Sequence, residues 1–245
     1  MGHVRTDPII SQTCLSDHVH TFYGAQHVHP TTTFQDLINT PDDQNTGNVL
    51  ENKSLYWHPT VYEYNRNTGG FTRDEMAQTS AYYIWESSQN TKAFPAGFRM
   101  IAGNKGNADG EFPNALAECV DPSPCQRDDC YTENTFFPQS ACAELEVSMS
   151  FPTCWDGTRL DTNDQSHVAY TLDGDVEGEC PTSHPHKLPQ IQLFFRIMPY
   201  NGGWHTFSDM SSIYHADYVS GWDEQFLQGV LDNCETESLA AMVSI

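Results

Sequence analysis

The residues best suited to chemistry form two histidine motifs near opposite ends of the chain. His18 and His20 flank a valine directly after Asp17. Far along the chain, His215 and Asp217 flank an alanine. In an extended segment alternate side chains point to the same face, so the two members of each pair would share a face. Imidazole titrates near neutral pH and is the side chain that most often binds metals.

If the two motifs meet, they offer three imidazoles and one carboxylate. That set, His18, His20, His215 and Asp217, would bind Zn²⁺ or another divalent metal ion. A second pair, His27 and His29, repeats the pattern nine residues later, a period too short for a structural repeat. The alternative interpretation is that all these histidines are surface or supporting residues that form hydrogen bonds with the backbone.

Carboxylates beside aromatic or imidazole rings indicate a second kind of chemistry. Hydrolysis of a glycan usually needs two carboxyl groups, one as proton donor and one as nucleophile or base. The candidates are Asp17, Asp156 and Asp217, with His20 and His215 orienting them or tuning their acidity. Sugars stack on aromatic rings, which makes the expected substrate-binding residues Trp57, His58, Trp155, Tyr214 and Trp222. Packing in the core is the alternative role of these rings.

The charge balance narrows the range of partners. Eleven lysines and arginines against 33 acids give a formal net charge of −22. Nucleic acids, anionic membrane surfaces and acidic polysaccharides are disfavoured, because they require clustered cations. Neutral polysaccharides remain open as partners. No apolar run approaches the length of a membrane-spanning helix, and no signal peptide is present, so we expect a mature or trimmed chain without membrane insertion.

Cysteine usage indicates the compartment. The eight cysteines stand at 14, 119, 125, 130, 142, 154, 180 and 234, an even number in a polar chain. We therefore expect most or all of them to form disulfides in an oxidising compartment, with a local network within 119–180. The sequence leaves 105 pairings open. A glycosylation sequon at Asn52 also fits secretion.

Hydrophobic periodicity predicts the fold class. Residues 144–151 and 190–197 alternate apolar and polar side chains, as half-buried antiparallel strands do. Further strands are expected within 55–64, 81–85, 98–102 and 167–171. A C-terminal helix carries an apolar stripe from Trp222 to Leu231, with Ser220 as its cap and Cys234 as a tether.

We therefore predict a single secreted domain over 1–245 that is dominated by β-structure. Its architecture would be an antiparallel, jelly-roll-like β-sandwich with one C-terminal helix and long disulfide-stapled loops. Residues 103–142 would form a cysteine-containing insertion, and 235–245 a frayed tail.

Several motifs in combination resemble a known domain. They are Gly2–Pro8, Ser16–His20, Ser54–Pro59, Phe94–Gly103, Phe151–Gly157, Ser166–Tyr170, Leu188–Pro189 and Tyr214–Asp223 without Val219. Together they resemble a secreted domain of unknown function that is common in filamentous fungi. That domain often accompanies WSC cell-wall domains or other carbohydrate-binding modules. The resemblance implies an extracellular or cell-wall setting and an association with polysaccharide, and it carries over no role for any residue.

The function expected first is therefore an extracellular polysaccharide-active protein, a glycoside hydrolase acting on neutral cell-wall glycan. The first alternative is a non-catalytic glycan-binding or sensor ectodomain of the cell wall. The second alternative is a metal-binding structural protein of extracellular assemblies. A shared site requires the histidine and aspartate motifs to converge, and the sequence specifies neither a substrate nor an oligomeric state.

Overall fold

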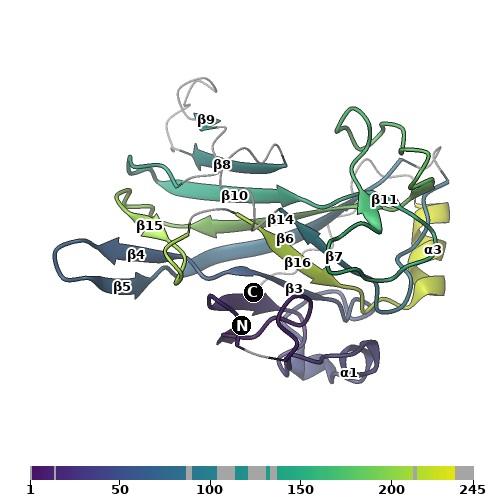
Figure 1. Cartoon of the computed structure of the whole chain (residues 1–245), viewed down its shortest axis with the longest axis horizontal. Helices are drawn as coiled ribbons and strands as arrows, with labels where there is room; N and C mark the ends of the chain where they lie inside the picture. Colours follow the sequence, from purple (N-terminus) through teal and green to yellow (C-terminus); the bar gives the residue numbers. More distant parts are fainter. Residues whose placement is uncertain are drawn as a thin grey trace.

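Antiparallel strand pairing dominates the computed structural model, which describes residues 2–13, 15–86, 90–103, 114–120, 131–132, 137–211 and 214–234 (Figure 1). The first sheet has the order β1 (Gly2–Val4), β2 (His20–Tyr23), β3 (Leu55–Pro59), β16 (Ala216–Val219) and β7 (Arg99–Ala102). The second sheet has the order β6 (Met76–Ile84), β14 (Gln190–Ile197), β10 (Glu144–Ser150), β8 (Ala115–Val120) and β9 (Tyr131–Thr132). The predicted β-rich class with packed antiparallel sheets is confirmed.

Two small sheets and three helical segments complete the described fold. One small sheet is β12 (Val168–Ala169), β11 (Cys154–Trp155) and β13 (His186–Lys187). The other is β15 (His205–Thr206), β4 (Tyr62–Asn65) and β5 (Gly70–Arg73), which projects from the body at the left of Figure 1 and is called the arm below. The helices are α1 (Phe34–Ile38), the 3-10 turn η1 (Asp42–Gln44) and the C-terminal α3 (Glu224–Asn233).

The main core lies between the two large sheets. The alternating residues of β10 and β14 point into it, as the period of two predicts. Leu145, Val147, Met149, Ile191, Leu193 and Phe195 are all buried there. From the first sheet, Tyr56, Met100 and Tyr218 enter the same cluster. Burial of this apolar surface is the main stabilising contribution to the sandwich.

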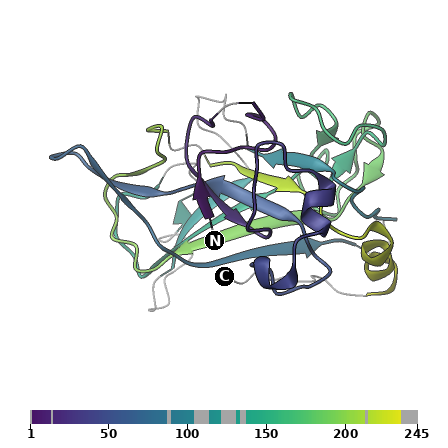
Figure 2. The same ribbon diagram turned by 90° about the horizontal axis from the view of Figure 1, so that it is seen from below.

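The first sheet is covered on its outer face as well. A second apolar cluster forms there from Phe22, Leu55, Trp57 and Val219 of the sheet with Leu37 of α1. The view from below shows the N-terminal segment and α1 lying across this face (Figure 2). Polar side chains on this face are therefore removed from water and need partners within the protein.

Within 103–142, the stretch expected to be a cysteine-containing insertion, β8 pairs with β10 as part of the second sheet. One expectation about the strands needs correction. The run 55–64 is not one strand, because β3 ends at Pro59 and β4 begins at Tyr62 in another sheet. Proline ends the first strand because it has no N–H group for the ladder.

The C-terminal helix is confirmed, but its ends differ from the prediction. The cap is Asp223, whose carboxylate accepts a hydrogen bond from the Phe226 backbone N–H at 2.8 Å. Ser220 lies three residues earlier, outside the helix. Leu227 and Leu231 face the core. Cys234 has a free thiol and forms no tether.

Two disulfides are present in the described part of the chain. Cys119 bonds to Cys142, and Cys154 bonds to Cys180. Both lie within the region where a local network was expected, whereas Cys14, Cys125 and Cys130 lie outside the described residues. Disulfides of this kind are typical of an oxidising compartment. The free thiol of Cys234 shows that pairing does not extend to every described cysteine.

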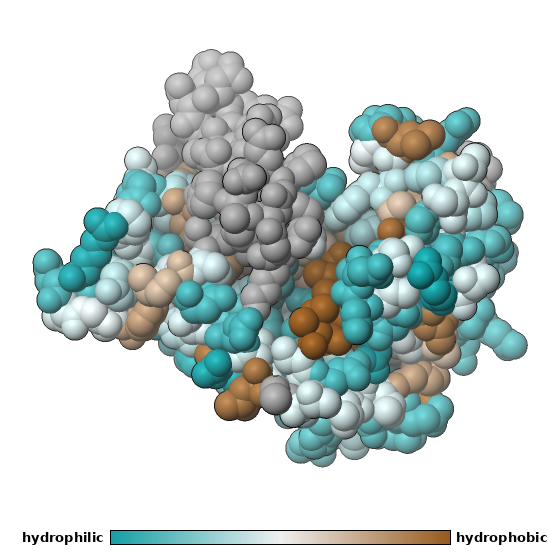
Figure 3. Space-filling view, in the orientation of Figure 1, coloured by the Kyte–Doolittle hydropathy of each residue, from teal (hydrophilic) through white to brown (hydrophobic). Residues whose placement is uncertain are grey.

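The surface is mostly hydrophilic on the face seen in Figure 3, with apolar side chains in small separate patches. No helix among the described residues is long and apolar enough to cross a membrane. Asn52 of the sequon is buried, and its amide group donates to the Tyr56 hydroxyl at 2.9 Å. That placement does not favour glycosylation of the folded chain.

A buried neutral histidine in this core makes stability depend on pH. The Nδ1–H of His58 donates to the Pro59 carbonyl, and its Nε2 accepts a hydrogen bond from the Tyr23 hydroxyl. Burial lowers the pKa of His58 from 6.5 to about 4. As pH falls below 6.5 the unfolded chain takes up this proton first, so the free energy of unfolding should fall by about 3 kcal/mol between pH 7 and pH 4. Urea unfolding at both pH values measures the loss, and His58→Gln should show a smaller one. Equal losses in both proteins would contradict the assignment.

Candidate metal centre

Three imidazoles meet at one end of the covered face of the first sheet. His20 is the first residue of β2, and His18 stands two residues before it on the same side. His215 directly precedes β16, the strand that pairs with the far side of β3. In the register of these strands, Pro59 of β3 lies opposite His20. His20 and His215 both approach His18 rather than each other, with ring centroids 4.4 and 4.9 Å from that of His18 and 6.1 Å from one another.

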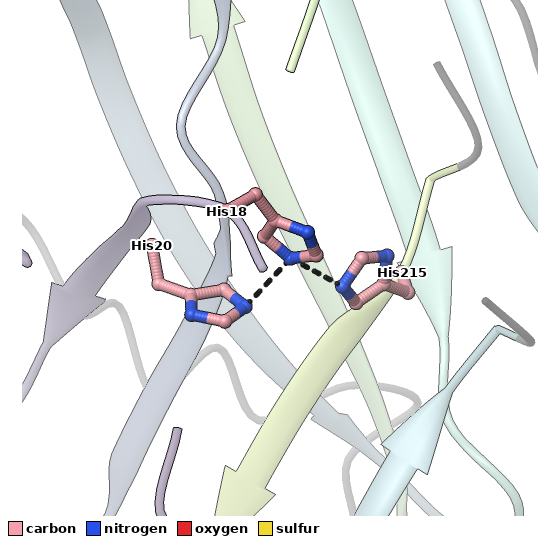
Figure 4. Close-up of side chains that lie close together, drawn as sticks. All are labelled: His18, His20 and His215. Atoms are coloured by element: carbon pink, nitrogen blue, oxygen red, sulfur yellow. Dashed lines mark hydrogen bonds between the residues drawn. The ribbon is translucent and has the colours of Figure 1, made fainter. Parts of the chain in front are cut away.

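The three Nε2 atoms converge (Figure 4). His18 Nε2 lies 2.9 Å from His20 Nε2 and 3.1 Å from His215 Nε2. All three ligand atoms lie within 4.8 Å of one another. The side chains are buried, with 1%, 0% and 6% of the surface of His18, His20 and His215 exposed. This group is the one cluster of metal-ligating side chains found in the described part of the chain.

The outer nitrogens of two of these rings are held by acceptors. His18 Nδ1 lies 3.0 Å from a carboxylate oxygen of Asp209, and His20 Nδ1 lies 2.8 Å from the Thr6 carbonyl oxygen. Neither acceptor carries a proton to give, so both Nδ1 atoms must be the donors. Each ring in its neutral form therefore directs the Nε2 lone pair toward the centre of the cluster. Metal-binding histidines show this same arrangement, with the second nitrogen donating to a carboxylate or carbonyl.

Lone pairs at these separations repel unless a positive centre lies among them. One proton on His18 Nε2 can point to His20 or to His215, but a single N–H cannot be directed well at both. A divalent cation accepts all three lone pairs at once. Zinc–nitrogen bonds of about 2.0–2.1 Å in tetrahedral geometry separate the nitrogens by about 3.3 Å. The separations of 2.9 and 3.1 Å are close to this spacing, and the third, between His20 and His215, is at most 4.8 Å, so the His20 and His215 rings would move together when an ion binds.

The electrostatic surroundings favour neutral imidazole beside a fixed carboxylate. Burial lowers the pKa of His20, and the neighbouring His18 and His215 lower it further. Burial alone would raise the pKa of Asp209, but hydrogen bonds from His18 and Ser211 outweigh it and hold that pKa below its usual range. The cluster therefore has an ionised carboxylate at its edge and a neutral His20 ring at its centre.

The backbone around the cluster is fixed from several directions. The Val19 N–H donates to the Ser208 hydroxyl at 2.8 Å, and the Val19 carbonyl accepts from the Thr60 N–H at 2.8 Å. On the other side, Gly103 has a φ of +97°, and a Cβ there would lie 2.8 Å from the Cβ of His215. A residue without a side chain is thus required for β7 to pass this close to the third histidine.

The predicted carboxylates occupy three different environments. Asp217 is buried on β16, where it pairs in register with Trp57, and it does not belong to the group of converging ligand atoms. Asp17 is exposed just before β2. Asp156 lies after β11 in a turn, where it forms an ion pair with Arg159. Burial alone would raise the pKa of Asp156, but N–H groups of residues 159 and 158 donate to it and lower that pKa.

The rings expected to bind sugar are mostly in the core. Trp57, Tyr214 and Trp222 are 0%, 1% and 3% exposed, and His58 is buried as described above. Trp155 alone is half-buried, and its indole N–H donates to the Arg159 carbonyl at 2.6 Å. Tyr214 and Trp222 therefore pack inside the sandwich, while Trp155 keeps part of its surface accessible beside Arg159.

The structure distinguishes the two His-x-His pairs and adds residues that the sequence did not indicate. His27 and His29 are exposed and do not join the cluster. Asp209 and Thr6 complete it through their contacts with the two Nδ1 atoms. No spacing rule relates Asp209 to His18, since 191 residues separate them.

Fold and site together define a mostly β, disulfide-bonded protein with a buried three-histidine cluster. The chain belongs to the family described as a domain of unknown function, DUF1996, which matches residues 7–222. The matched range contains all three histidines and Asp209. Searches of curated proteins and of solved structures gave no match.

The contact between Gly103 and His215 can be tested by adding one methyl group. Gly103→Ala should lower the free energy of unfolding by about 3 kcal/mol or more, because it combines an unfavourable φ with a close approach to His215. Gly174→Ala is the matched control, with a φ of +85° and no atom within 4 Å of the added Cβ. It should cost about 1–2 kcal/mol. Urea unfolding compares the two, and equal losses would show that the approach to His215 is not restrictive.

Proposed function

We propose that the protein is a metal-binding protein of an oxidising, extracellular setting. One divalent transition-metal ion is held by the Nε2 atoms of His18, His20 and His215. The observation that carries this proposal is the convergence of three buried Nε2 atoms, with the rings of His18 and His20 oriented from behind by Asp209 and the Thr6 carbonyl.

The chemistry of the donor set supports zinc as the first choice. Imidazole nitrogen suits Zn²⁺, Cu²⁺ and Ni²⁺, whereas Ca²⁺ and Mg²⁺ prefer oxygen ligands. Three neutral imidazoles leave the ion's charge uncompensated, and the carboxylate of Asp209 next to His18 offsets part of it. The net charge of −22 also favours the approach of a cation over that of an anion.

The position of the cluster supports a structural role for the ion. His18 lies in the segment that covers the first sheet, whereas His215 begins a central strand of that sheet 197 residues later. An ion bound to both would fasten the cover to the sheet. Because the ligands are assembled only in the folded chain, the binding free energy of the ion adds to the stability of the fold.

The glycoside-hydrolase hypothesis has less support from geometry and stays a prediction. Its two best-placed carboxylates, Asp156 and Asp217, differ strongly in environment: one is engaged by Arg159 in a turn, the other buried on a central strand. A metal-binding structural protein, which the sequence offered as an alternative, agrees with the converging histidines without requiring an exposed groove.

Metal binding at this cluster is directly measurable. Metal-free protein should bind one Zn²⁺ per chain in isothermal titration calorimetry. At a free Zn²⁺ concentration 100 times Kd, the free energy of unfolding should rise by about 2.7 kcal/mol. His20→Ala should abolish both effects, whereas His27→Ala, which removes an imidazole from the exposed His-x-His pair, should preserve them.

The histidine pair makes the outcome of this experiment unambiguous. If His27→Ala loses binding as His20→Ala does, the ion binds elsewhere or through several weak surface sites. If wild-type protein binds no transition metal stoichiometrically, the cluster is held by a shared proton and the proposal is wrong. Thermal unfolding of each metal-free variant separates loss of binding from loss of fold.

The role of the supporting carboxylate gives a second test. Asp209→Ala should weaken Zn²⁺ binding by about 10–100-fold, because His18 then loses the partner that fixes its ring and raises its basicity. Asp209→Asn retains an acceptor oxygen without the charge, so its Zn²⁺ affinity should lie between those of wild type and Asp209→Ala. Asp164→Ala removes an exposed turn aspartate of the same charge and should leave Kd unchanged. Equal affinities in wild type and Asp209→Ala would remove Asp209 from the site.

A further inference from the structure

The arm carries a group of aromatic side chains on one of its faces. Tyr62 and Tyr64 of β4 are two residues apart and therefore point to the same face of the arm. Phe71 of β5 pairs in register with Tyr64. Trp204, just before β15, lies beside Tyr64, whose N–H donates to its carbonyl at 2.7 Å. The Tyr64 and Phe71 ring centroids are 5.1 Å apart. We call these four residues the arm cluster.

The arm cluster is unusually open to solvent. Phe71 is 44% exposed and Trp204 is 48% exposed, whereas most rings of this protein lie in the core. The arm projects at the left end of Figures 1 and 3, away from both large sheets. Exposed aromatic rings that are grouped together mark a binding surface more often than isolated ones do.

Two arginines lie on the same face as the rings. The guanidinium of Arg66 stacks 3.2 Å above the centre of the Trp204 ring. Arg73 pairs in register with Tyr62 and so points to the aromatic face. Glu63, which lies between the two tyrosines in sequence, points to the opposite face by strand alternation. The aromatic face of the arm is therefore locally cationic in a protein of net charge −22.

These two arginines differ from the other cations of the protein. The remaining lysines and arginines in the described part of the chain each donate to an oxygen or nitrogen of another residue. They are Arg5, Lys53, Lys92, Arg99, Arg159, Lys187 and Arg196. Among described residues, Arg66 and Arg73 alone have no such acceptor, although the chain contains 33 acids. Their N–H donors are left available for an external anion.

We infer that the arm binds a strand of carboxylate-bearing polysaccharide, a polymer of uronic acids. The sugar rings contact the exposed parts of Phe71 and Trp204, and the carboxylates accept hydrogen bonds from Arg66 and Arg73. Guanidinium matches a carboxylate with two parallel N–H donors, and stacking on Trp204 orients Arg66 in advance. This inference is independent of the metal centre.

The size and charge of the arm favour this partner over a protein or a membrane. A stable protein interface needs about 800 Å² per partner, whereas the arm consists of two four-residue strands and one two-residue strand. An anionic membrane would bring a broad negative surface against a strongly acidic body. A single polymer strand approaches the arm alone, and the acids of the body are screened beyond about 8–10 Å at physiological salt. The net charge therefore disfavours binding of acidic polysaccharides to the body of the protein, but not to the arm.

The test is binding to polygalacturonate in affinity electrophoresis. Wild-type protein should be retarded, and methyl-esterified polygalacturonate, which has the same backbone without charge, should retard it at least tenfold less. The double variant Arg66→Gln/Arg73→Gln should weaken binding by about tenfold, because two exposed ion pairs with carboxylates of the polymer are lost. Lys53→Gln with Arg159→Gln removes the same charge elsewhere and should leave binding within about twofold. Trp204→Ala should weaken it while retaining both charges.

Several outcomes would overturn the inference. Equal binding of the esterified polymer would show that charge does not select the ligand. Equal loss in both double variants would show a general effect of net charge rather than a site on the arm. Retardation by polyglutamate as strong as by polygalacturonate, or binding only to phosphatidylserine vesicles, would assign the arm to an acidic protein or a membrane. Thermal unfolding confirms that each variant is folded; for Arg73 this is expected because β5 is exposed along its whole length.

Discussion

Burial of the first sheet on both of its faces is the constraint on which the rest of the structure depends. One face packs against the second sheet, and the other is covered by the N-terminal segment and the region around α1. A polar side chain on either face cannot remain hydrated and must find a partner inside the protein. His58 meets this requirement on the inner side through Tyr23 and a backbone carbonyl. On the outer side, His18 and His20 meet it through Asp209 and the Thr6 carbonyl, which turn both Nε2 atoms toward the centre of the cluster.

That arrangement explains why the histidine cluster differs from an ordinary group of buried polar residues. Buried imidazoles usually satisfy one nitrogen as donor and the other as acceptor, as His58 does. In His18 and His20 the donors are used on Asp209 and Thr6, which leaves acceptors facing acceptors. A network of this type is stabilising only with a positive centre among the lone pairs. The cluster also joins the beginning of the chain to one of its last strands, so any ion it binds acts on the whole first sheet.

Charge in this protein is distributed very unevenly at the scale of single elements. Most cations serve the fold: Arg99 donates to backbone carbonyls of residues 8 and 32, and Arg196 bridges Glu144 and Glu146 on the second sheet. The arm is the exception, with guanidinium groups beside exposed rings. Whole-chain charge therefore describes long-range attraction of ions, whereas recognition at short range depends on which few cations remain available.

The sequence by itself determined the features that depend on near neighbours along the chain. The alternation of apolar and polar residues predicted β10 and β14. The spacing of two residues predicted that His18 and His20 share a face, and the cysteine content indicated an oxidising compartment. Only the tertiary structure decided which His-x-His pair is buried, that His215 rather than Asp217 joins it, and that Asp209 supports it. The physical reason is that local spacing specifies the face of a strand but not its neighbour. Contacts across nearly 200 residues depend on strand order, on register and on which segment covers the sheet.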